Sequence, residues 1–241
     1  MLRTALLLPF TVLSFLAPQD PKPAPAVNSA LVPQPREGGW MRRHEQINAV
    51  VREHAGAVDL VFVGDSITQG WEGAGKSVWV EHYGERRAVN LGISGDRTEH
   101  VLWRLDHGNL DGIAPKVAVV MIGTNNFGHG TNDAAEILAG VRAVVARIRA
   151  ASPTTKVLLL DIFPRGETFN PMRGGILQVN QALQRLHDGN DVVCLQIGHR
   201  FIEDDGTIQK SVMPDFLHLT EDGYRRWAAA IEPTLVQMLG S

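Results

Sequence analysis

Three polar side chains of this sequence are of the types that together activate a nucleophile. Ser66 follows an apolar run in the segment Gly64-Asp65-Ser66-Ile67, and Asp215 and His218 lie three residues apart near the C-terminus. A serine hydroxyl is a poor nucleophile near neutral pH, so it needs a base within hydrogen-bond reach and a third group that orients this base. We therefore predict that Ser66 is a nucleophile, that His218 is its base, and that Asp215 orients the imidazole.

The chemistry of acyl transfer also requires donors for the negative charge that develops on the carbonyl oxygen. The candidates are the backbone N–H groups of Ser66 and Gly95 and the side-chain amide of Asn125. A glycine at position 95 allows close approach to a substrate because it has no Cβ. These groups are predicted to form an oxyanion hole.

The elements that position these residues are predicted from an alternation of short apolar runs and longer amphipathic segments. Strands are expected at 58–63, 88–93, 116–122, 157–162 and 192–197, and helices at 40–54, 98–107, 132–151, 175–188 and 221–239. The run 116–122 is apolar without alternation, as in a parallel strand covered on both faces. Right-handed crossovers turn this pattern into a three-layer α/β/α sandwich around a five-stranded parallel sheet. The candidate residues follow the strands, so we expect them at the carboxyl edge of the sheet.

Composition excludes several other classes of protein. The chain has 241 residues, of which 44% are apolar and 20% charged, and these values are typical of a globular domain. The net charge of −3 and the lack of a long basic run argue against a nucleic-acid partner. The single cysteine, Cys194, excludes an intrachain disulfide and a structural zinc site.

The first residues are predicted to be a targeting signal rather than part of the folded domain. Arg3 precedes an apolar stretch at 6–17, which indicates a signal peptide over residues 1–17, too short to span a bilayer. Residues 18–36 contain a cluster of prolines and are predicted to be an extended linker. The folded domain is expected to cover residues 37–241, and the protein is expected to be secreted or periplasmic.

Four short blocks of this sequence resemble the SGNH or GDSL hydrolases. They are GDSI, NLGISGD, GTNN and DFLH, in that order along the chain. The runs GDRTEHVLWRLDHGNL and GTNNFGH further resemble the catalytic subunits of intracellular platelet-activating factor acetylhydrolase. This resemblance implies a flavodoxin-like sandwich without metal or cofactor, Ser66 as nucleophile, Gly95 and Asn125 in the oxyanion hole, and Asp215 and His218 in the triad. It also implies that a homodimer is possible.

Further residues of these blocks are candidates for contacts with substrate. Arg97 and Arg165 could touch the leaving group or brace loops, and Asp65 could serve only the turn that presents Ser66. Trp71 and Trp79 could stack on sugar rings or lie in the core. The candidates for lining the substrate pocket are Asp65, Asp96, Arg97, Asn126, His129 and Arg165.

One rival motif is present but lies in the wrong context. Residues 70–77, GWEGAGKS, fit the phosphate-loop pattern G-x-x-x-x-G-K-[ST]. A phosphate loop leaves its strand directly and opens a helix, whereas here GDSITQ intervenes. Nucleotide hydrolysis is therefore rejected.

The sequence thus predicts an exported serine esterase that removes a short acyl group, acetyl above all, from a small ester or an acetylated carbohydrate. Two alternatives remain open. One is a lysophospholipase-like or thioesterase-like activity of the same family. The other is a non-catalytic carbohydrate-binding protein on the same fold.

Overall fold

The computed structural model describes residues 27–240 and contains a five-stranded sheet in which every pairing is parallel. The strands are β1 (Leu60–Gly64), β2 (Ala88–Asn90), β3 (Val117–Met121), β4 (Lys156–Leu160) and β5 (Val192–Leu195). Their order is β2-β1-β3-β4-β5, the flavodoxin-like order. The predicted fold class is confirmed.

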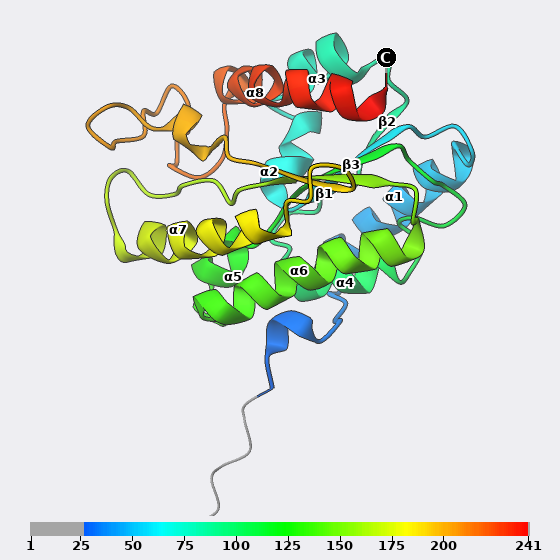
Figure 1. Ribbon diagram of the computed structural model, residues 1–241, viewed down its shortest axis with the longest axis horizontal. Coiled ribbons are helices and arrows are strands. Elements are labelled where there is room, and N and C mark those ends of the chain that lie inside the picture. The colour runs from blue at the N-terminus through cyan, green and yellow to red at the C-terminus, as the bar shows by residue number, and fades with distance from the viewer. Residues whose placement is uncertain (1–26, 241) are drawn as a thin grey trace, which may run out of the picture.

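Helices cover both faces of this sheet (Figure 1). One layer contains α1 (Gly39–Glu53), α4 (Thr98–Leu105), α6 (Ala134–Ala151) and α7 (Pro171–Leu183). The opposite layer contains α3 (Lys76–Tyr83) and α8 (Glu221–Leu239). Strand side chains alternate between two cores: Val61 and Val63 face the first layer, and Leu60 and Phe62 face the second. Both faces of β1 and β3 are buried, as the uninterrupted apolar run predicted for β3.

Short helices connect the strands to these layers at the carboxyl edge. They are α2 (Ser66–Gln69) and the 3₁₀ turn η2 (Gly70–Glu72) after β1, α5 (Thr124–Gly128) after β3, and the 3₁₀ turn η4 (Gly198–Phe201) after β5. Two further 3₁₀ turns lie elsewhere, η1 (Ser29–Leu31) before α1 and η3 (Gln184–Leu186) between α7 and β5. The predictions did not include α2, α3 or α5. Each has eight residues or fewer, which is too short for a helical period to be seen in the sequence.

Where an observed helix end differs from the end predicted from the hydrophobic periodicity, a capping residue sets the observed end. The predicted helix 221–239 is found with those bounds after its N-cap Thr220. Helix α7 begins at Pro171 instead of residue 175, because the Asn170 side chain accepts the Arg173 backbone N–H and proline suits the first helical turn. Caps therefore decide these ends.

The N-terminal segment differs from the predicted linker. Ala30 is fully buried, and its carbonyl oxygen accepts a hydrogen bond of 3.0 Å from the Thr98 hydroxyl. Asn28 donates to the Glu136 carbonyl, and the Gln34 backbone N–H donates to the Glu99 carbonyl. The segment therefore packs on α4 and α6, and the prediction that folding begins near Glu37 is corrected for residues 28–36. The predicted signal peptide lies outside the described residues.

Burial and element order decide between the alternatives for the segment after α2, which were a sugar-stacking surface and a phosphate loop. Trp71 is fully buried, with its ring 4.5 Å from Tyr224 and 5.1 Å from Trp227, and Trp79 lies 5.1 Å from Phe62. Both tryptophans pack in the aromatic core: Trp71 is closed off from any ligand, and Trp79 is partly buried against the same cluster. Helix α2 and η2 separate β1 from α3, so the GWEGAGKS run lacks the direct strand-to-helix passage of a phosphate loop.

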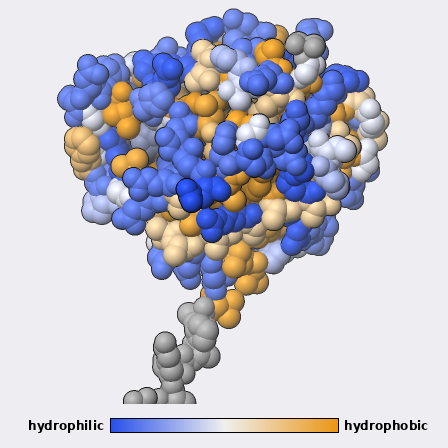
Figure 2. Space-filling model, viewed as in Figure 1, coloured by the Kyte–Doolittle hydropathy of each residue, from blue (hydrophilic) through white to orange (hydrophobic). Residues whose placement is uncertain are grey.

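The surface is mainly polar on the face that Figure 2 shows, with small and separate hydrophobic areas. The more exposed large apolar side chains among residues 27–240 include Val27, Phe169 and Leu177. Within the same residues, no helix combines the length and the apolar character that a membrane span needs.

Candidate active site

Ser66, His218 and Asp215 form one chain of hydrogen bonds. The Ser66 Oγ lies 2.9 Å from His218 Nε2, and His218 Nδ1 lies 2.6 Å from Asp215 Oδ2. Partial burial would raise the pKa of the Asp215 carboxyl, but the hydrogen bonds and charge of His218 together hold this pKa below its ordinary value. An ionised Asp215 only accepts, so Nδ1 carries the proton and Nε2 is free to accept the serine proton. Residues 152 positions apart are thereby brought together.

The turn after β1 presents the serine. Asp65 is the N-cap of α2, and its Oδ1 accepts the Ile67 backbone N–H at 2.9 Å. Gly64 is needed here because a Cβ at this position would stand 2.1 Å from the Thr68 hydroxyl oxygen. Ser66 is thus the first residue of a short helix that leaves the sheet edge, and its side chain is half-buried.

The loop before α8 holds the other two side chains. Asp215 Oδ1 accepts the backbone N–H groups of Leu217 and His218 at 3.1 and 2.8 Å. Phe216 between them has a φ of 58°, which allows the tight turn that brings carboxylate and imidazole together. The loop closes where Thr220 bonds back to Ser211 and Val212. The local geometry predicted from the Asp-x-x-His spacing is therefore present.

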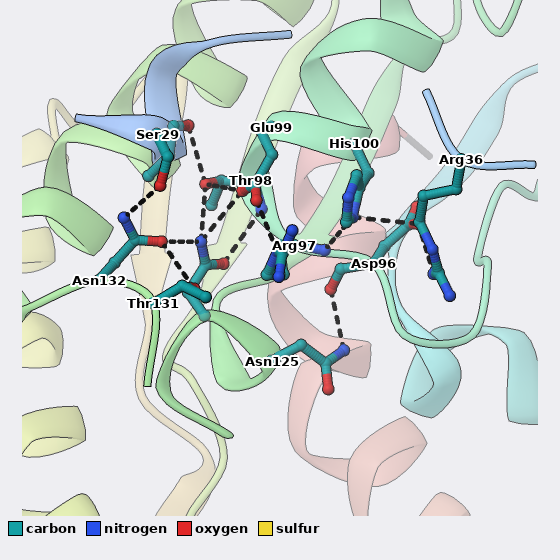
Figure 3. A network of polar contacts seen from close by, with 12 residues as sticks. Ser29, Arg36, Asp96, Arg97, Thr98, Glu99, His100, Asn125, Thr131 and Asn132 are labelled. Carbon is teal, nitrogen blue, oxygen red and sulfur yellow. Dashed lines mark hydrogen bonds and ion pairs between the residues drawn. The ribbon is translucent and has the colours of Figure 1, made fainter. Parts of the chain in front are cut away.

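The two other candidate oxyanion donors lie on neighbouring loops that are tied to each other. The Asn125 side-chain amide donates to the Asp96 carbonyl oxygen at 2.9 Å, next to Gly95 (Figure 3). The Ser94 backbone N–H donates to Gln69 Oε1 at 2.7 Å, which ties the same loop to the end of α2. The loops after β1, β2 and β3 thus form one connected unit. Gly95 has a φ of 76°, a conformation that favours glycine.

The buried ion pair between Asp96 and Arg104 supports this unit of connected loops. Asp96 accepts hydrogen bonds from Trp40 Nε1 at 2.6 Å and from Arg104 Nε at 2.7 Å, and both ionic side chains are fully buried. Arg104 also donates to the Gly64 carbonyl at 3.2 Å and to the Asn109 side chain. Burial raises the pKa of Asp96, while the Arg104 charge opposes that shift. The pair connects the end of β1 to the Gly95 loop.

Three of the predicted pocket residues are closed off from substrate, and these predictions are corrected. Asp65 and Asp96 are fully buried in the contacts described above. Asn126 is also fully buried: its amide donates to Asn132 Oδ1 at 2.9 Å and to Glu99 Oε2 at 3.2 Å, and its oxygen accepts the Thr98 N–H. A side chain with all of these contacts has no face left for a ligand. These residues support the site instead.

The remaining three predicted pocket residues lie within reach of solvent. Arg165 is half-buried and donates to the Thr124 carbonyl at 3.0 Å, so it braces the loop after β3. Burial lowers the pKa of Arg165, and the charges of Asp65 and Asp215 act in the opposite direction. Arg97 and His129 line a small polar pocket that also contains Gly95.

Sequence patterns alone do not single out several residues that support the site. Arg36 falls in the predicted linker, and Trp40 and Arg104 fall in predicted helices without a predicted role. An arginine on the apolar face of α4, next to Val101 and Leu105, is the one available sign of a buried ion pair. Its partner is visible only in the fold.

The fold and the comparison with known families define the class of this protein as an ester hydrolase. Residues 62–226 match the family model described as GDSL-like Lipase/Acylhydrolase family. The chain belongs to this family, as the four sequence blocks predicted.

Known proteins similar to this chain agree with that assignment. Human platelet-activating factor acetylhydrolase IB subunit alpha2 is 38% identical over 83% of this chain and 85% of its own length, and the human alpha1 subunit is 36% identical over 84% and 85%. Among solved structures, a GDSL-like lipase from Bacteroides thetaiotaomicron has a TM-score of 0.65 at 20% identity, covering 81% of this chain and 97% of that chain. An acetylxylan esterase from Geobacillus stearothermophilus has a TM-score of 0.58 at 18% identity, covering 76% and 94%. The two structures share the fold.

Proposed function

We propose that this protein is a serine esterase that removes acetyl groups, with Ser66 as the nucleophile. The observation that carries the proposal is the hydrogen-bond chain from Ser66 through His218 to Asp215, with distances of 2.9 and 2.6 Å. Such a chain supplies a nucleophile, a base and a group that orients the base. A non-catalytic carbohydrate-binding protein would need none of them.

The mechanism follows from the positions of these groups. His218 Nε2 takes the Ser66 proton as Oγ attacks the ester carbonyl carbon, and Asp215 stabilises the imidazolium that forms. The negative charge on the carbonyl oxygen is held by the N–H groups of Ser66 and Gly95 and by the Asn125 amide. His218 then protonates the leaving alcohol oxygen as the C–O bond breaks, which leaves an acetyl-enzyme. Water, deprotonated by the same imidazole, attacks this intermediate and releases acetate and free serine.

The alcohol portion is proposed to be large, with an acetylated carbohydrate as the substrate class. The His218 and Asp215 side chains are 45% and 53% exposed, so the nucleophile stands at an open surface that a large alcohol can approach. The names of the relatives support acetyl transfer, because they describe an acetylhydrolase and an acetylxylan esterase. A lysophospholipase-like or thioesterase-like activity is the alternative.

The proposed nucleophile is tested by labelling with a fluorophosphonate and by kinetics with p-nitrophenyl acetate. Ser66→Ala is expected to lose the label and at least about 10³-fold in kcat, since removal of a triad serine removes the covalent route. Ser77→Ala, at an exposed serine on α3, is the matched control and keeps both. Labelling that persists in Ser66→Ala would refute the assignment.

The acyl preference is tested with acetyl, butyryl and octanoyl esters of the same alcohol. We expect kcat/KM to decrease from acetyl to octanoyl. A preference for octanoyl would favour the lipase-like alternative and overturn the acetyl assignment.

We further propose that the protein is exported to the periplasm or the exterior. The support is Arg3 followed by the apolar stretch at 6–17. Cell fractionation with N-terminal sequencing of the mature protein tests this, and an uncleaved chain retained in the cytoplasm would contradict it.

A further inference from the structure

A second concave site lies directly beside Gly95. It is a pocket of about 190 Å³ between the N-terminal segment, the start of α4 and the end of α5. Its lining residues are Gln34, Pro35, Arg36, Gly95, Arg97, His100 and His129. Four of the seven carry a basic side chain, and none carries a carboxylate.

The two arginines of the pocket keep donors that the protein does not use. Arg36 donates from Nη1 to the Ser94 carbonyl at 2.9 Å, and Arg97 donates from Nε to Glu99 at 2.5 Å. Within residues 27–240, Nε and Nη2 of Arg36 and both terminal nitrogens of Arg97 have no hydrogen-bond partner. The two side chains are 39% and 22% exposed, so these donors are open to a ligand.

His100 adds a neutral donor to the same pocket. Its Nδ1 accepts the Arg97 backbone N–H at 3.0 Å, so the ring proton must lie on Nε2. Burial lowers the pKa of His100 to about 3, and the positive charges of Arg97 and Arg36 add to that shift. The imidazole therefore stays neutral and donates from Nε2.

The carboxylates near the pocket do not cancel its charge. Asp96 is fully buried, bonded to Arg104 and 3.8 Å from Arg36 Nη1, and Glu99 is only 2% exposed and bonded to Arg97 and Asn126. Three guanidinium groups, of Arg36, Arg97 and Arg104, stand against these two carboxylates, which leaves one positive charge in excess. Part of an arginine fork is exposed on the pocket side, a geometry that suits carboxylate and phosphate oxygens.

The pocket shares Gly95 with the proposed reaction centre. A Cβ on Gly95 would stand 2.9 Å from Arg36 Nη1, so the guanidinium lies against the residue whose N–H is proposed to bind the carbonyl oxygen. Figure 3 shows Arg36, Arg97 and His100 around Asp96, with Asn125 on the adjoining loop. A ligand in this pocket is thus next to the ester.

We propose that this pocket binds an anionic oxygen group, a carboxylate or a phosphate, on the alcohol portion of the ester. The proposal rests on the proposed function, because an acetyl group carries no charge and the anion must then belong to the alcohol. The enzyme thereby prefers acetylated acidic or phosphorylated sugars to neutral ones. The N-terminal segment contributes a specificity residue, Arg36, through its packing on α4.

The test compares kcat/KM for three acetylated methyl glycosides: a glucuronide, a glucoside 6-phosphate and a neutral glucoside. We expect a preference of at least about tenfold for one or both charged substrates, equivalent to about 1.4 kcal/mol, and this preference should shrink at high salt. Preference for the glucuronide alone identifies a carboxylate as the ligand, and preference for the phosphate ester alone identifies a phosphate. Equal rates for all three would overturn the proposal.

Variants connect the preference to the pocket. Arg97→Gln and Arg36→Gln should reduce the ratio of charged to neutral kcat/KM towards one. This ratio of kcat/KM values is the readout, because a change in stability or in the reaction at Ser66 affects the charged and the neutral substrate alike and cancels in the ratio. Arg142→Gln, at an exposed arginine on α6, is the matched control that keeps the ratio. A ratio unchanged in both pocket variants would overturn the assignment.

A binding measurement separates this proposal from the proposed function. In Ser66→Ala protein, titration calorimetry with methyl glucuronide, methyl glucoside 6-phosphate and methyl glucoside needs no turnover. We expect one or both charged glycosides to bind and the neutral one not to, and Arg97→Gln in the same background to weaken that binding at least tenfold. Turnover that persists in Ser66→Ala refutes the nucleophile assignment, whereas binding that is absent for both charged glycosides, or indifferent to Arg97→Gln, refutes the pocket.

Discussion

Replacing Asp96 with alanine is expected to destabilise the protein by about 3 to 5 kcal/mol, the usual effect of removing one member of a buried ion pair. The Arg104 side chain is fully buried and would retain only the Gly64 carbonyl and the Asn109 side chain as partners. Trp40 Nε1 would lose its acceptor as well. For a chain of this size, roughly 2 to 4 °C per kcal/mol predicts a decrease in Tm of about 6 to 20 °C.

The assay is urea and thermal unfolding of Asp96→Ala, Arg104→Met and the double variant at pH 7. We expect the double variant to be more stable than Asp96→Ala, because the unpaired guanidinium has then gone. The cycle yields the coupling energy between the two positions. An effect of Asp96→Ala below about 1 kcal/mol, or zero coupling, would refute the view that this pair supports the site.

Three further predictions concern the turn after β1, the Gly95 loop and α8. Burial raises the pKa of Asp65 to about 7 from an ordinary 3.8. Between these two pH values the folded protein keeps a proton that the unfolded chain has lost, so the folded state becomes less stable as pH rises. The free energy of unfolding should then fall by about 3 kcal/mol more between pH 4 and 7 in the native protein than in Asp65→Asn, and equal slopes would contradict this. In Gly95→Ala, a side chain is forced into a backbone conformation with a φ of 76°, and its Cβ stands close to Arg36, so kcat for p-nitrophenyl acetate should decrease at least about tenfold. The control is Gly130→Ala, which has a φ of 63° but no neighbour within 4 Å, and which should keep its kcat. Tyr224→Phe removes a hydrogen bond of 2.6 Å to a buried carbonyl in α2, and chemical denaturation should show a loss of about 1 to 3 kcal/mol, with no loss speaking against this contact.

The fold class could be predicted because its signals are local and strong. The five predicted apolar runs contain the five strands, and the uninterrupted run at 116–122 correctly indicates a strand buried on both faces. Strand ends were predicted less well: the second run extends to residue 93, but β2 ends at Asn90. The Leu91 and Ile93 backbone N–H groups still donate to carbonyls of β1, so the chain stays beside β1 past the regular strand, while the Asn90 side chain accepts the Gly92 N–H.

The linker prediction was wrong for residues 28–36 because composition does not include tertiary contacts. Prolines indicate an extended chain, and an extended chain can still pack when it meets a suitable surface. Here Ala30 is fully buried against α4 and α6. Arg36 reaches the Gly95 loop through the same packing.

The sequence by itself determined the order of the elements, the edge of the sheet where the candidate residues lie, and the residue types of the proposed nucleophile, base and orienting carboxylate. These follow from periodicity, from turn residues after strands and from the short Asp-x-x-His spacing, all of which act over a few residues. The tertiary structure alone decided which polar residues face a ligand and which are buried. Asp65, Asp96 and Asn126 were candidate pocket residues, but they are buried and support the loops of the site. Arg36 was predicted to lie in the linker, but it lines a pocket. The reason is physical: burial and charge pairing are set by neighbours distant in sequence, and those neighbours meet only when the helices pack on the sheet.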